Sequence, residues 1–193
     1  MHPMVDIITN MERYIFIGDS LTRGYGVPSG HGWVGLLAQD PFFADKKVEN
    51  HGVDGDTLQG ILNRLERLTI SDQDLVFVMG GTNDILMGRS ADYCISKLKS
   101  IVNHIQISGA HLVIGLPPHI EFDPFDQNDV IVAYNDRIKE LARKEEIPLI
   151  DFYSPLKAAS EANQVVYEGD VHPNEAGYKI MYTCALEAYK IPV

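Results

Sequence analysis

Residues 74–81 read DLVFVMGG, in which five consecutive apolar residues lead into two glycines. A strand exposed on one face alternates apolar and polar residues, whereas a continuous apolar run indicates burial on both faces, as in a parallel sheet. Residues 74–81 therefore predict such a strand. Four further short runs predict its neighbours, and the second of them is the least apolar: 14–18, 47–52, 111–118 and 147–153.

Segments between these runs carry apolar residues at helical spacing. In residues 57–68, five apolar side chains share one helical face: Leu58, Ile61, Leu62, Leu65 and Leu68. Residues 91–107, 129–146 and about 174–190 have the same period. Strands that alternate with helices in this way predict a three-layer α/β/α fold, with helices on both faces of a parallel sheet.

The chain has 193 residues, with 45% apolar and 22% charged residues, which suits one globular domain. We find no internal repeat and no domain linker. The prediction is a single domain over residues 1–193, in which residues 1–12 are an N-terminal extension because the first strand starts near Tyr14.

The net charge of −11 disfavours nucleic acid and anionic membrane surfaces as partners. No segment approaches the ~20 consecutive apolar residues of a membrane span. The N-terminus lacks the basic start and apolar core of a secretory signal, so the expected location is cytoplasmic. Cys94 and Cys184 lie in helical segments among apolar neighbours and are predicted to be buried, reduced thiols. The oligomeric state stays open.

Three strand ends carry residues suited to chemistry, and open α/β sheets bind ligands beyond the carboxyl ends of their strands. Ser20 lies in GDSLT after the first strand and is a nucleophile if a base removes its proton, or else a helix cap. Gly55 lies in GVDGDT after the second strand, where its amide can face an oxyanion or simply form a turn. Asn83 lies in GGTND after the third, as an amide donor or a cap.

A fourth candidate is His172, in EGDVHP (168–173) near the end of the chain. Pro173 fixes the local backbone and suits the first turn of a helix, so the histidine is presented on a stiff loop. Among the seven histidines it alone lies between nearby carboxylates and a helix start. His172 is therefore the expected base.

GDSLT, the glycine of GDT (55–57), GGTND and the late HPN, in this order, resemble the SGNH hydrolases, also called the GDSL esterase/lipase family. The resemblance runs from about Tyr14 to the end of the chain. It implies a flavodoxin-like fold with a five-stranded parallel sheet. It also implies ester hydrolysis through an acyl-enzyme, without a metal or organic cofactor. Ser20 would be the nucleophile and His172 the base, and the Ser20 amide, the Gly55 amide and Asn83 would form the oxyanion hole.

The sequence departs from the family at the acid, which usually lies three residues before the histidine. Gly169 occupies that position. Three alternatives follow. Asp170 is favoured, because side chains two residues apart in an extended segment point the same way. Glu168 is longer and reaches from four residues back. The third alternative is a Ser–His dyad, in which a backbone carbonyl or water holds the imidazole.

The expected substrate is a small-molecule ester with a short or medium acyl chain, because the chain has little room for a lid domain. Residues 22–33 would wall the acyl pocket. Residues 117–129, with Phe122 and Phe125, would form a mobile rim, or a connection that its phenylalanines pin to the sheet edge. Two competing functions are a flavodoxin-like module that binds phosphate or flavin mononucleotide, and a catalytically impaired SGNH fold used for binding.

Overall fold

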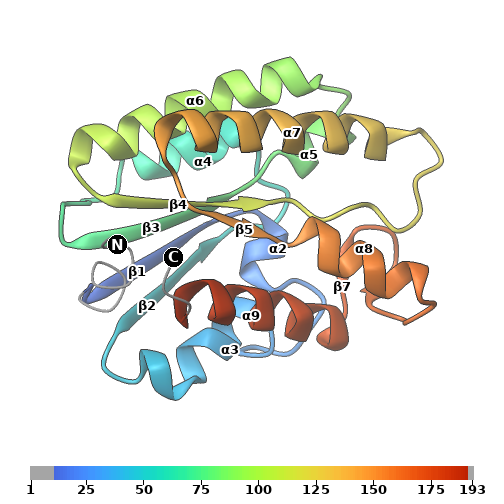
Figure 1. The fold of residues 1–193 in the computed structure, drawn as a ribbon, viewed down its shortest axis with the longest axis horizontal. Helices are drawn as coiled ribbons and strands as arrows, with labels where there is room; N and C mark the ends of the chain where they lie inside the picture. Colours follow the sequence, from blue (N-terminus) through green and yellow to red (C-terminus); the bar gives the residue numbers. More distant parts are fainter. Residues whose placement is uncertain (1–10, 191–193) are drawn as a thin grey trace.

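The computed structural model describes residues 11–190, and the five predicted strands form one sheet in it (Figure 1). The strands are β1 (Arg13–Gly18), β2 (Lys47–Gly52), β3 (Asp74–Met79), β4 (His111–Leu116) and β5 (Leu149–Asp151). Their order is β2-β1-β3-β4-β5, and each neighbouring pair is parallel. This is the flavodoxin-like order, so the predicted fold class is confirmed.

The register of the sheet brings three strand ends to one level. Gly18, the last residue of β1, pairs with Gly52 of β2 on one side and Met79 of β3 on the other. The loops that carry Ser20, Gly55 and Asn83 therefore start side by side.

Helices cover both faces of the sheet (Figure 1). One face holds α4 (Leu58–Leu65), α6 (Ala91–Ser108) and α7 (Gln127–Glu145), and the other holds α3 (Trp33–Gln39), α8 (Tyr153–Glu161) and α9 (Glu175–Lys190). The four predicted helical segments correspond to α4, α6, α7 and α9, and are confirmed.

The two faces of the sheet have different cores because side chains alternate along each strand. Toward α4, α6 and α7 the strands present aliphatic residues such as Ile15 and Val76. Toward α3 and α9 they present aromatic residues, and Trp33 packs against Phe77 with ring centroids 5.0 Å apart. Truncation of a buried aromatic residue of this kind to alanine costs about 3–5 kcal/mol.

Several short elements were not predicted from the sequence. They are α2 (Ser20–Arg23), α5 (Thr82–Leu86), the 3₁₀ helix η1 (Pro41–Phe43), α3 and α8. The apolar run 147–153 was read as one strand, but β5 ends at Asp151. The carboxylate of Asp151 accepts hydrogen bonds from the amide of Ser154 (3.0 Å) and from its hydroxyl (2.6 Å), so the chain turns into α8 there.

A second, two-stranded antiparallel sheet lies outside the main one and was also not predicted. It is a hairpin of β6 (Tyr167–Glu168) and β7 (His172–Pro173). Gly169 opens the connecting turn with φ +74°, in the left-handed region that glycine adopts without strain. An aspartate at position 169, where the family usually has its acid, would therefore have to adopt a left-handed backbone conformation that few residues favour.

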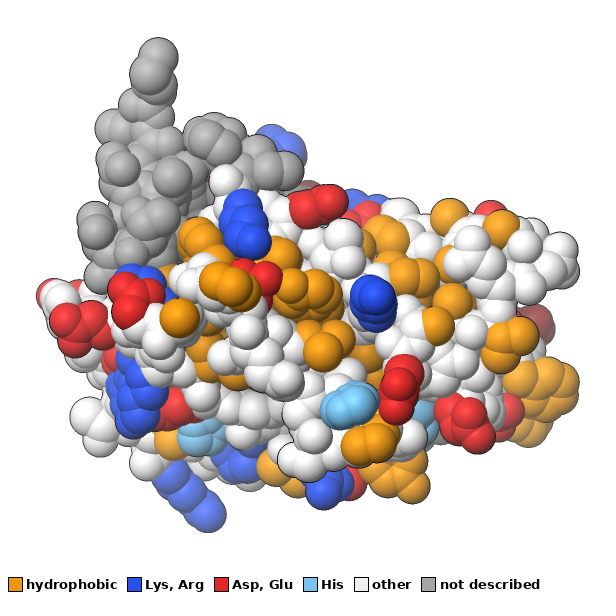
Figure 2. Space-filling model, turned by 90° about the horizontal axis from the view of Figure 1, so that it is seen from below, with side chains coloured by type: hydrophobic (Ala, Val, Ile, Leu, Met, Phe, Trp, Pro, Cys, Tyr) orange, Lys and Arg blue, Asp and Glu red, His pale blue; other side chains and the backbone are white. Residues whose placement is uncertain are grey.

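The proposed N-terminal extension, residues 1–12, lies almost entirely outside the described residues, although Met11 packs partly buried against the aromatic core. Cys94 is buried as predicted, whereas Cys184 is only partly buried, and both are free thiols. Within residues 11–190, no helix has the length and apolar character that a membrane crossing requires. Figure 2 shows one face of the molecule, on which Lys and Arg side chains lie in separate groups among acidic and apolar ones.

Candidate active site

Ser20 is the first residue of α2, directly beyond β1. Asp19 caps this short helix, and its carboxylate accepts a hydrogen bond of 2.9 Å from the Leu21 amide. Trp33 of the aromatic core donates its indole N–H to the Leu21 carbonyl at 3.0 Å. Ser20 is 6% exposed, and its position is therefore determined by a strand end, a cap and a core contact.

The Asp19 carboxyl beside Ser20 is fully buried. One of its oxygens, Oδ2, has no hydrogen-bond partner within residues 11–190. Burial raises the pKa of Asp19 to about 7, and the hydrogen bond from the Leu21 amide opposes this shift. Near neutral pH the carboxyl is therefore only partly ionised, which limits the negative charge beside the nucleophile.

Gly55 lies in the turn that follows β2. The turn begins at Val53, whose amide donates to the Gly18 carbonyl at 3.1 Å, and closes with a 3.2 Å bond from the Asp56 amide to the Val53 carbonyl. Gly55 has φ +70°, and a Cβ there would meet nothing within 4 Å, so the backbone conformation rather than crowding favours glycine. Its amide makes no hydrogen bond to any described residue and is free to face a ligand.

Asn83 lies in α5, just beyond β3 and Gly81. Gly81 has φ +111°, and a Cβ there would lie 2.7 Å from the ring of Tyr134, so this approach requires glycine. Asn83 Nδ2 donates to the Asp56 carbonyl at 2.8 Å. A primary amide carries two N–H donors, so Asn83 keeps one for a ligand.

Arg64 of α4 braces the strand ends below these residues. Its guanidinium donates to the carbonyls of Gly18 (2.8 Å) and His51 (2.5 Å), and to the Asp56 carboxylate (2.8 Å). The Asp84 carboxylate adds a bond of 2.9 Å from the Leu58 amide, which links α5 to the start of α4. Sequence analysis missed Arg64, because no local pattern distinguishes it from a solvent-facing helical arginine.

His172 reaches Ser20 from the hairpin. Its Nε2 lies 3.0 Å from Ser20 Oγ, although 152 residues separate the two in sequence. The ring of Tyr25 packs against the imidazole, with centroids 4.5 Å apart and planes at 43°. Burial lowers the pKa of His172, and the negative charge of Asp54 opposes that shift. Asp54 is paired with Arg23 of α2.

None of the predicted acids contacts His172. Asp170 lies exposed in the turn, and its carboxylate makes no hydrogen bond to any residue of the described part of the chain. Glu168 stands opposite His172 in the hairpin register, but its side chain is exposed and equally without a bond there. The role of Asp170 as orienting acid stays a prediction without a supporting contact.

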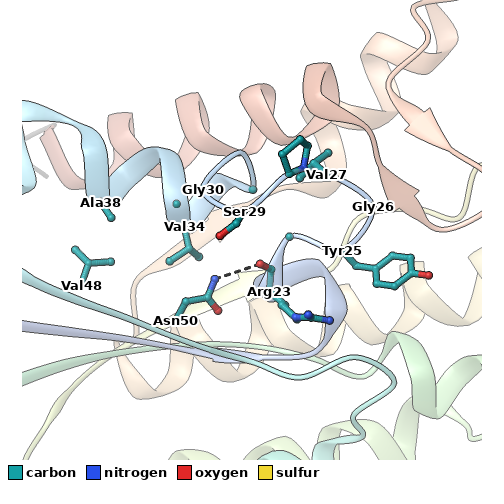
Figure 3. Close-up of a pocket in the computed structure, with 14 residues that line it drawn as sticks. Arg23, Tyr25, Gly26, Val27, Ser29, Gly30, Val34, Ala38, Val48 and Asn50 are labelled. Carbon is teal, nitrogen blue, oxygen red and sulfur yellow. Dashed lines mark hydrogen bonds between the residues drawn. The ribbon is translucent and has the colours of Figure 1, made fainter.

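A cavity of about 570 Å³ lies behind the loop that follows α2 (Figure 3). Its walls include backbone of the glycine-rich segment 24–32 and the side chains of Val34, Ala38 and Val48. Neither Ser20 nor His172 is among the residues that line it. Tyr25 projects away from the Val34 and Ala38 wall in Figure 3. The segment therefore lines a cavity, and its role as the wall of an acyl pocket stays a prediction.

The structure contradicts one of the two interpretations of segment 117–129, that of a connection pinned by its phenylalanines. Phe122 and Phe125 are 63% and 78% exposed, so they do not pin the segment to the sheet edge. Asn128 instead fixes the segment from within, because its side chain accepts a hydrogen bond from the Ile120 amide and donates one to the Ile120 carbonyl, both at 2.8 Å. The phenylalanines are left free to contact a ligand.

Residues 11–190 hold no group of three or more His, Cys, Asp or Glu side chains placed to bind a metal ion. An imidazole nitrogen lies against Ser20, and the loops that start beside it at the neighbouring strand ends carry a backbone amide and a side-chain amide with free N–H donors. These groups suit the formation and stabilisation of an oxyanion at an acyl carbon.

Comparisons with known proteins agree with this geometry. The sequence profile of the GDSL-like lipase/acylhydrolase family matches residues 16–180. The structure superposes with TM-score 0.87 on a member of the lipolytic G-D-S-L family from Veillonella parvula, which is 35% identical, and the match covers 93% of this chain and 99% of that one.

Two characterised relatives extend the comparison. An arylesterase of Vibrio mimicus is 32% identical over 150 residues, covering 74% of this chain and 71% of its own. Esterase TesA of Pseudomonas aeruginosa is 28% identical, covering 84% of this chain and 80% of its own. The profile match spans most of the sequence, and the protein therefore belongs to the GDSL-like lipase/acylhydrolase family, the SGNH hydrolases that its motifs resemble.

Proposed function

We propose that this protein is a serine esterase that hydrolyses a small carboxylic ester through an acyl-enzyme. The observation that carries the proposal is the 3.0 Å contact between Ser20 Oγ and His172 Nε2. That distance lies within the range in which a histidine can accept the proton of an attacking hydroxyl.

In the first half of the reaction, Ser20 Oγ attacks the ester carbonyl carbon while its proton passes to His172 Nε2. The carbonyl oxygen becomes an oxyanion that accepts hydrogen bonds from the Ser20 amide, the Gly55 amide and Asn83 Nδ2. The Ser20 amide is available because the first amides of a helix have no intrahelical acceptor. The tetrahedral intermediate then releases the alcohol, whose oxygen takes the proton from the imidazolium.

In the second half, water attacks the acyl carbon and gives its proton to His172. Collapse of the second tetrahedral intermediate breaks the bond to Ser20 Oγ, which recovers a proton from the imidazolium. The carboxylic acid leaves and the enzyme is restored. Every step uses the same donors, so the site needs no rearrangement between the two halves.

For the orientation of the base, the geometry favours the Ser–His dyad over Asp170 or Glu168. Burial lowers the pKa of His172, which keeps the imidazole neutral and able to accept a proton near pH 7. The charge of Asp54 favours the imidazolium that forms during attack. Tyr25 restricts the ring from one side.

Exposed apolar side chains in the loops after β3 and β4 could accommodate an ester with an apolar part of short or medium length. Met87, in the turn after α5, is 66% exposed, and Phe122 and Phe125 add further apolar surface. Gln127 joins the two regions through a hydrogen bond of 3.4 Å to the Leu86 carbonyl. The name of the Vibrio mimicus relative, arylesterase, supports testing aryl esters first.

The phosphate- or flavin-binding alternative loses its main support. It requires the Ser20 hydroxyl as a phosphate ligand, and this hydroxyl lies at hydrogen-bond distance from His172. It also requires an anion beside the buried carboxyl of Asp19, and the ionised fraction of that carboxyl would repel the anion.

The decisive test is Ser20→Ala, assayed with p-nitrophenyl esters of increasing acyl length beside the wild type. We expect the kcat of the variant to fall by roughly 10⁴–10⁶, because nucleophile and base act as a unit. A matched control is Ser100→Ala, an exposed serine of α6 that lies outside every proposed part of the site. Ser20→Ala with wild-type turnover would refute the proposed function, and an inactive wild type across the panel would favour the catalytically impaired alternative.

A further inference from the structure

A buried polar cluster lies beside the hairpin, away from Ser20. His119 follows β4 and is 8% exposed, and Tyr167 begins β6 and is 6% exposed. The Tyr167 hydroxyl donates to the His119 carbonyl at 3.0 Å and lies 3.2 Å from His119 Nδ1. The two rings pack edge to face with centroids 5.0 Å apart. The hydroxyl therefore ties the first strand of the hairpin to the end of the main sheet.

Glu121 completes the cluster and reaches the hairpin a second time. Its carboxylate lies 3.1 Å from His119 Nε2 and accepts a hydrogen bond from Ser160 of α8. Its backbone amide donates to the Asp170 carbonyl at 2.7 Å. The cluster thus holds the hairpin at Tyr167, where it begins, and at Asp170, in its turn.

We propose that His119, Glu121 and Tyr167 are positioning residues, which hold the hairpin so that His172 stays against Ser20 without a carboxylate on its imidazole. The proposal rests on the proposed function, because it assigns the cluster a part in the same reaction. Two observations support this role. The imidazole has no bonded carboxylate among the described residues, and the hairpin that carries it is fastened by this cluster.

The hairpin needs an external fastening. Its strands have two residues each, and an isolated two-stranded hairpin is at best marginally stable in water. Proton transfer, by contrast, requires the base to be held within about 0.5 Å of its productive position. Asn174 supplies a further link beyond β7, because its amide donates to the Val166 carbonyl at 3.0 Å.

The cluster is also organised to persist at neutral pH. Burial lowers the pKa of His119, although Glu121 opposes this shift, so the neutral ring can keep its N–H on Nε2 for Glu121. Nδ1 is then an acceptor that shares the single Tyr167 hydroxyl hydrogen with the His119 carbonyl. Burial also raises the pKa of Tyr167 far above its usual value, so the hydroxyl keeps its proton. Each polar atom that the cluster buries then has a partner.

The first experiment is Tyr167→Phe, which removes the hydroxyl and keeps the ring. We expect kcat to fall about tenfold with KM within about twofold, since a hydrogen bond of modest strength is lost and the substrate surface is not touched. The rate at which a fluorophosphonate labels Ser20 should fall by the same factor, because labelling also needs the base. Tyr189→Phe is the matched control: its hydroxyl is buried without a partner in the described structure, and its removal should change neither rate.

A second pair of variants separates positioning from general loss of structure. His119→Ala removes both side-chain partners, whereas His119→Asn places an amide oxygen near the position of Nδ1 and can again accept from Tyr167. We expect the kcat of His119→Ala to be about tenfold below that of the wild type, and the kcat of His119→Asn to regain at least half of this loss. If Tyr167→Phe does not fold, this pair decides the question.

A readout independent of catalysis distinguishes this proposal from the proposed function. Amide hydrogen exchange of Glu121 and of residues 168–172 should accelerate about tenfold in Tyr167→Phe, while exchange in β1 and β3 stays unchanged. Wild-type kcat, labelling and hairpin exchange in both Tyr167→Phe and His119→Ala would overturn the positioning role. A Ser20→Ala variant with wild-type activity would refute the proposed esterase function. The exchange experiment would still test whether the cluster holds the hairpin, because it does not depend on catalysis.

Discussion

The two halves of the site are built differently. Ser20, Gly55 and Asn83 extend from the ends of three adjacent parallel strands, and Arg64 braces those ends by bonds to two backbone carbonyls and a carboxylate. His172 extends from a two-residue strand outside the main sheet. Ser20 and the proposed oxyanion donors thus extend directly from the main sheet, while His172, the proposed base, is carried by a separate small hairpin.

This difference shows how each half keeps its geometry. In the serine half, sheet register alone brings the loops to one level, and side chains only refine their positions. In the histidine half, the alignment depends on contacts between residues 48 positions apart in sequence, such as His119 and Tyr167. Perturbing the first half should therefore damage oxyanion stabilisation, and perturbing the second should damage proton transfer.

The largest effect expected from this comparison is that of Asn83→Ala. Removing the side-chain donor should lower kcat by about 10²–10³, because only the two backbone amides would remain as donors to the oxyanion. The fold should stay intact. Steady-state kinetics on an aryl ester and a thermal melt measure both quantities. Asn63→Ala, an exposed asparagine on α4, is the control. A change of less than about threefold in Asn83→Ala would remove Asn83 from the oxyanion hole.

A smaller effect should follow from Arg64→Lys. An ammonium group cannot reproduce the planar fork that bonds Gly18, His51 and Asp56 together, so two or more of these bonds are lost. We expect kcat to fall about tenfold and the free energy of unfolding to fall by about 1–3 kcal/mol. Arg67→Lys, exposed near the end of α4, is the matched control.

Hydrogen exchange in Arg64→Lys tests whether the Ser20 loops and the His172 hairpin are held independently. Arg64→Lys should accelerate exchange at residues 53–56 and leave residues 168–172 as in the wild type. Equal acceleration in both segments would show that the two halves are one cooperative unit, contrary to the separation described above.

The smallest effect is expected on the pH profile of kcat/KM. His172 must be neutral to act as base, and burial lowers its pKa below the ordinary value of 6.5, so the activity should rise with pH with a midpoint below 6.5. Asp54 raises the pKa of His172. Asp54→Asn should therefore move the rising limb to lower pH while kcat on the plateau changes by less than about threefold.

The former candidates for the acid serve as controls in the same assay. Asp170→Asn and Glu168→Gln should leave both the limb and the plateau unchanged, because neither carboxylate contacts the imidazole. A large loss of kcat in Asp170→Asn alone would reinstate Asp170 as the orienting acid and displace the dyad.

Prediction from the sequence succeeded where the physical signal is local and repetitive. The buried strands are apolar along their whole length, as in residues 75–79, and the long helices repeat an apolar face. It was less accurate where a single polar contact ends an element. Asp151 ends β5 and starts α8 with two side-chain bonds, which an apolar run through residue 153 does not reveal.

The candidate site follows the same division. Ser20, Gly55 and Asn83 were identified because parallel strands bring their ends together, whatever the details of packing. Arg64 and Glu121 were not, since an arginine on a helix and a glutamate in a loop have no distinctive spacing. Their importance comes from partners that the fold supplies.

The sequence by itself determined the three-layer architecture, because hydrophobic periodicity acts through burial, and its motifs GDSLT, GGTND and HPN indicated the family by resemblance. It also indicated which strand ends lie together, because parallel strands end at one edge of the sheet. Only the tertiary structure decided what surrounds His172. Gly169 places a left-handed turn at the position of the usual acid, and the hairpin is bonded to a cluster in the loop that follows β4. Such contacts depend on distances across the fold, which no local pattern of residues records.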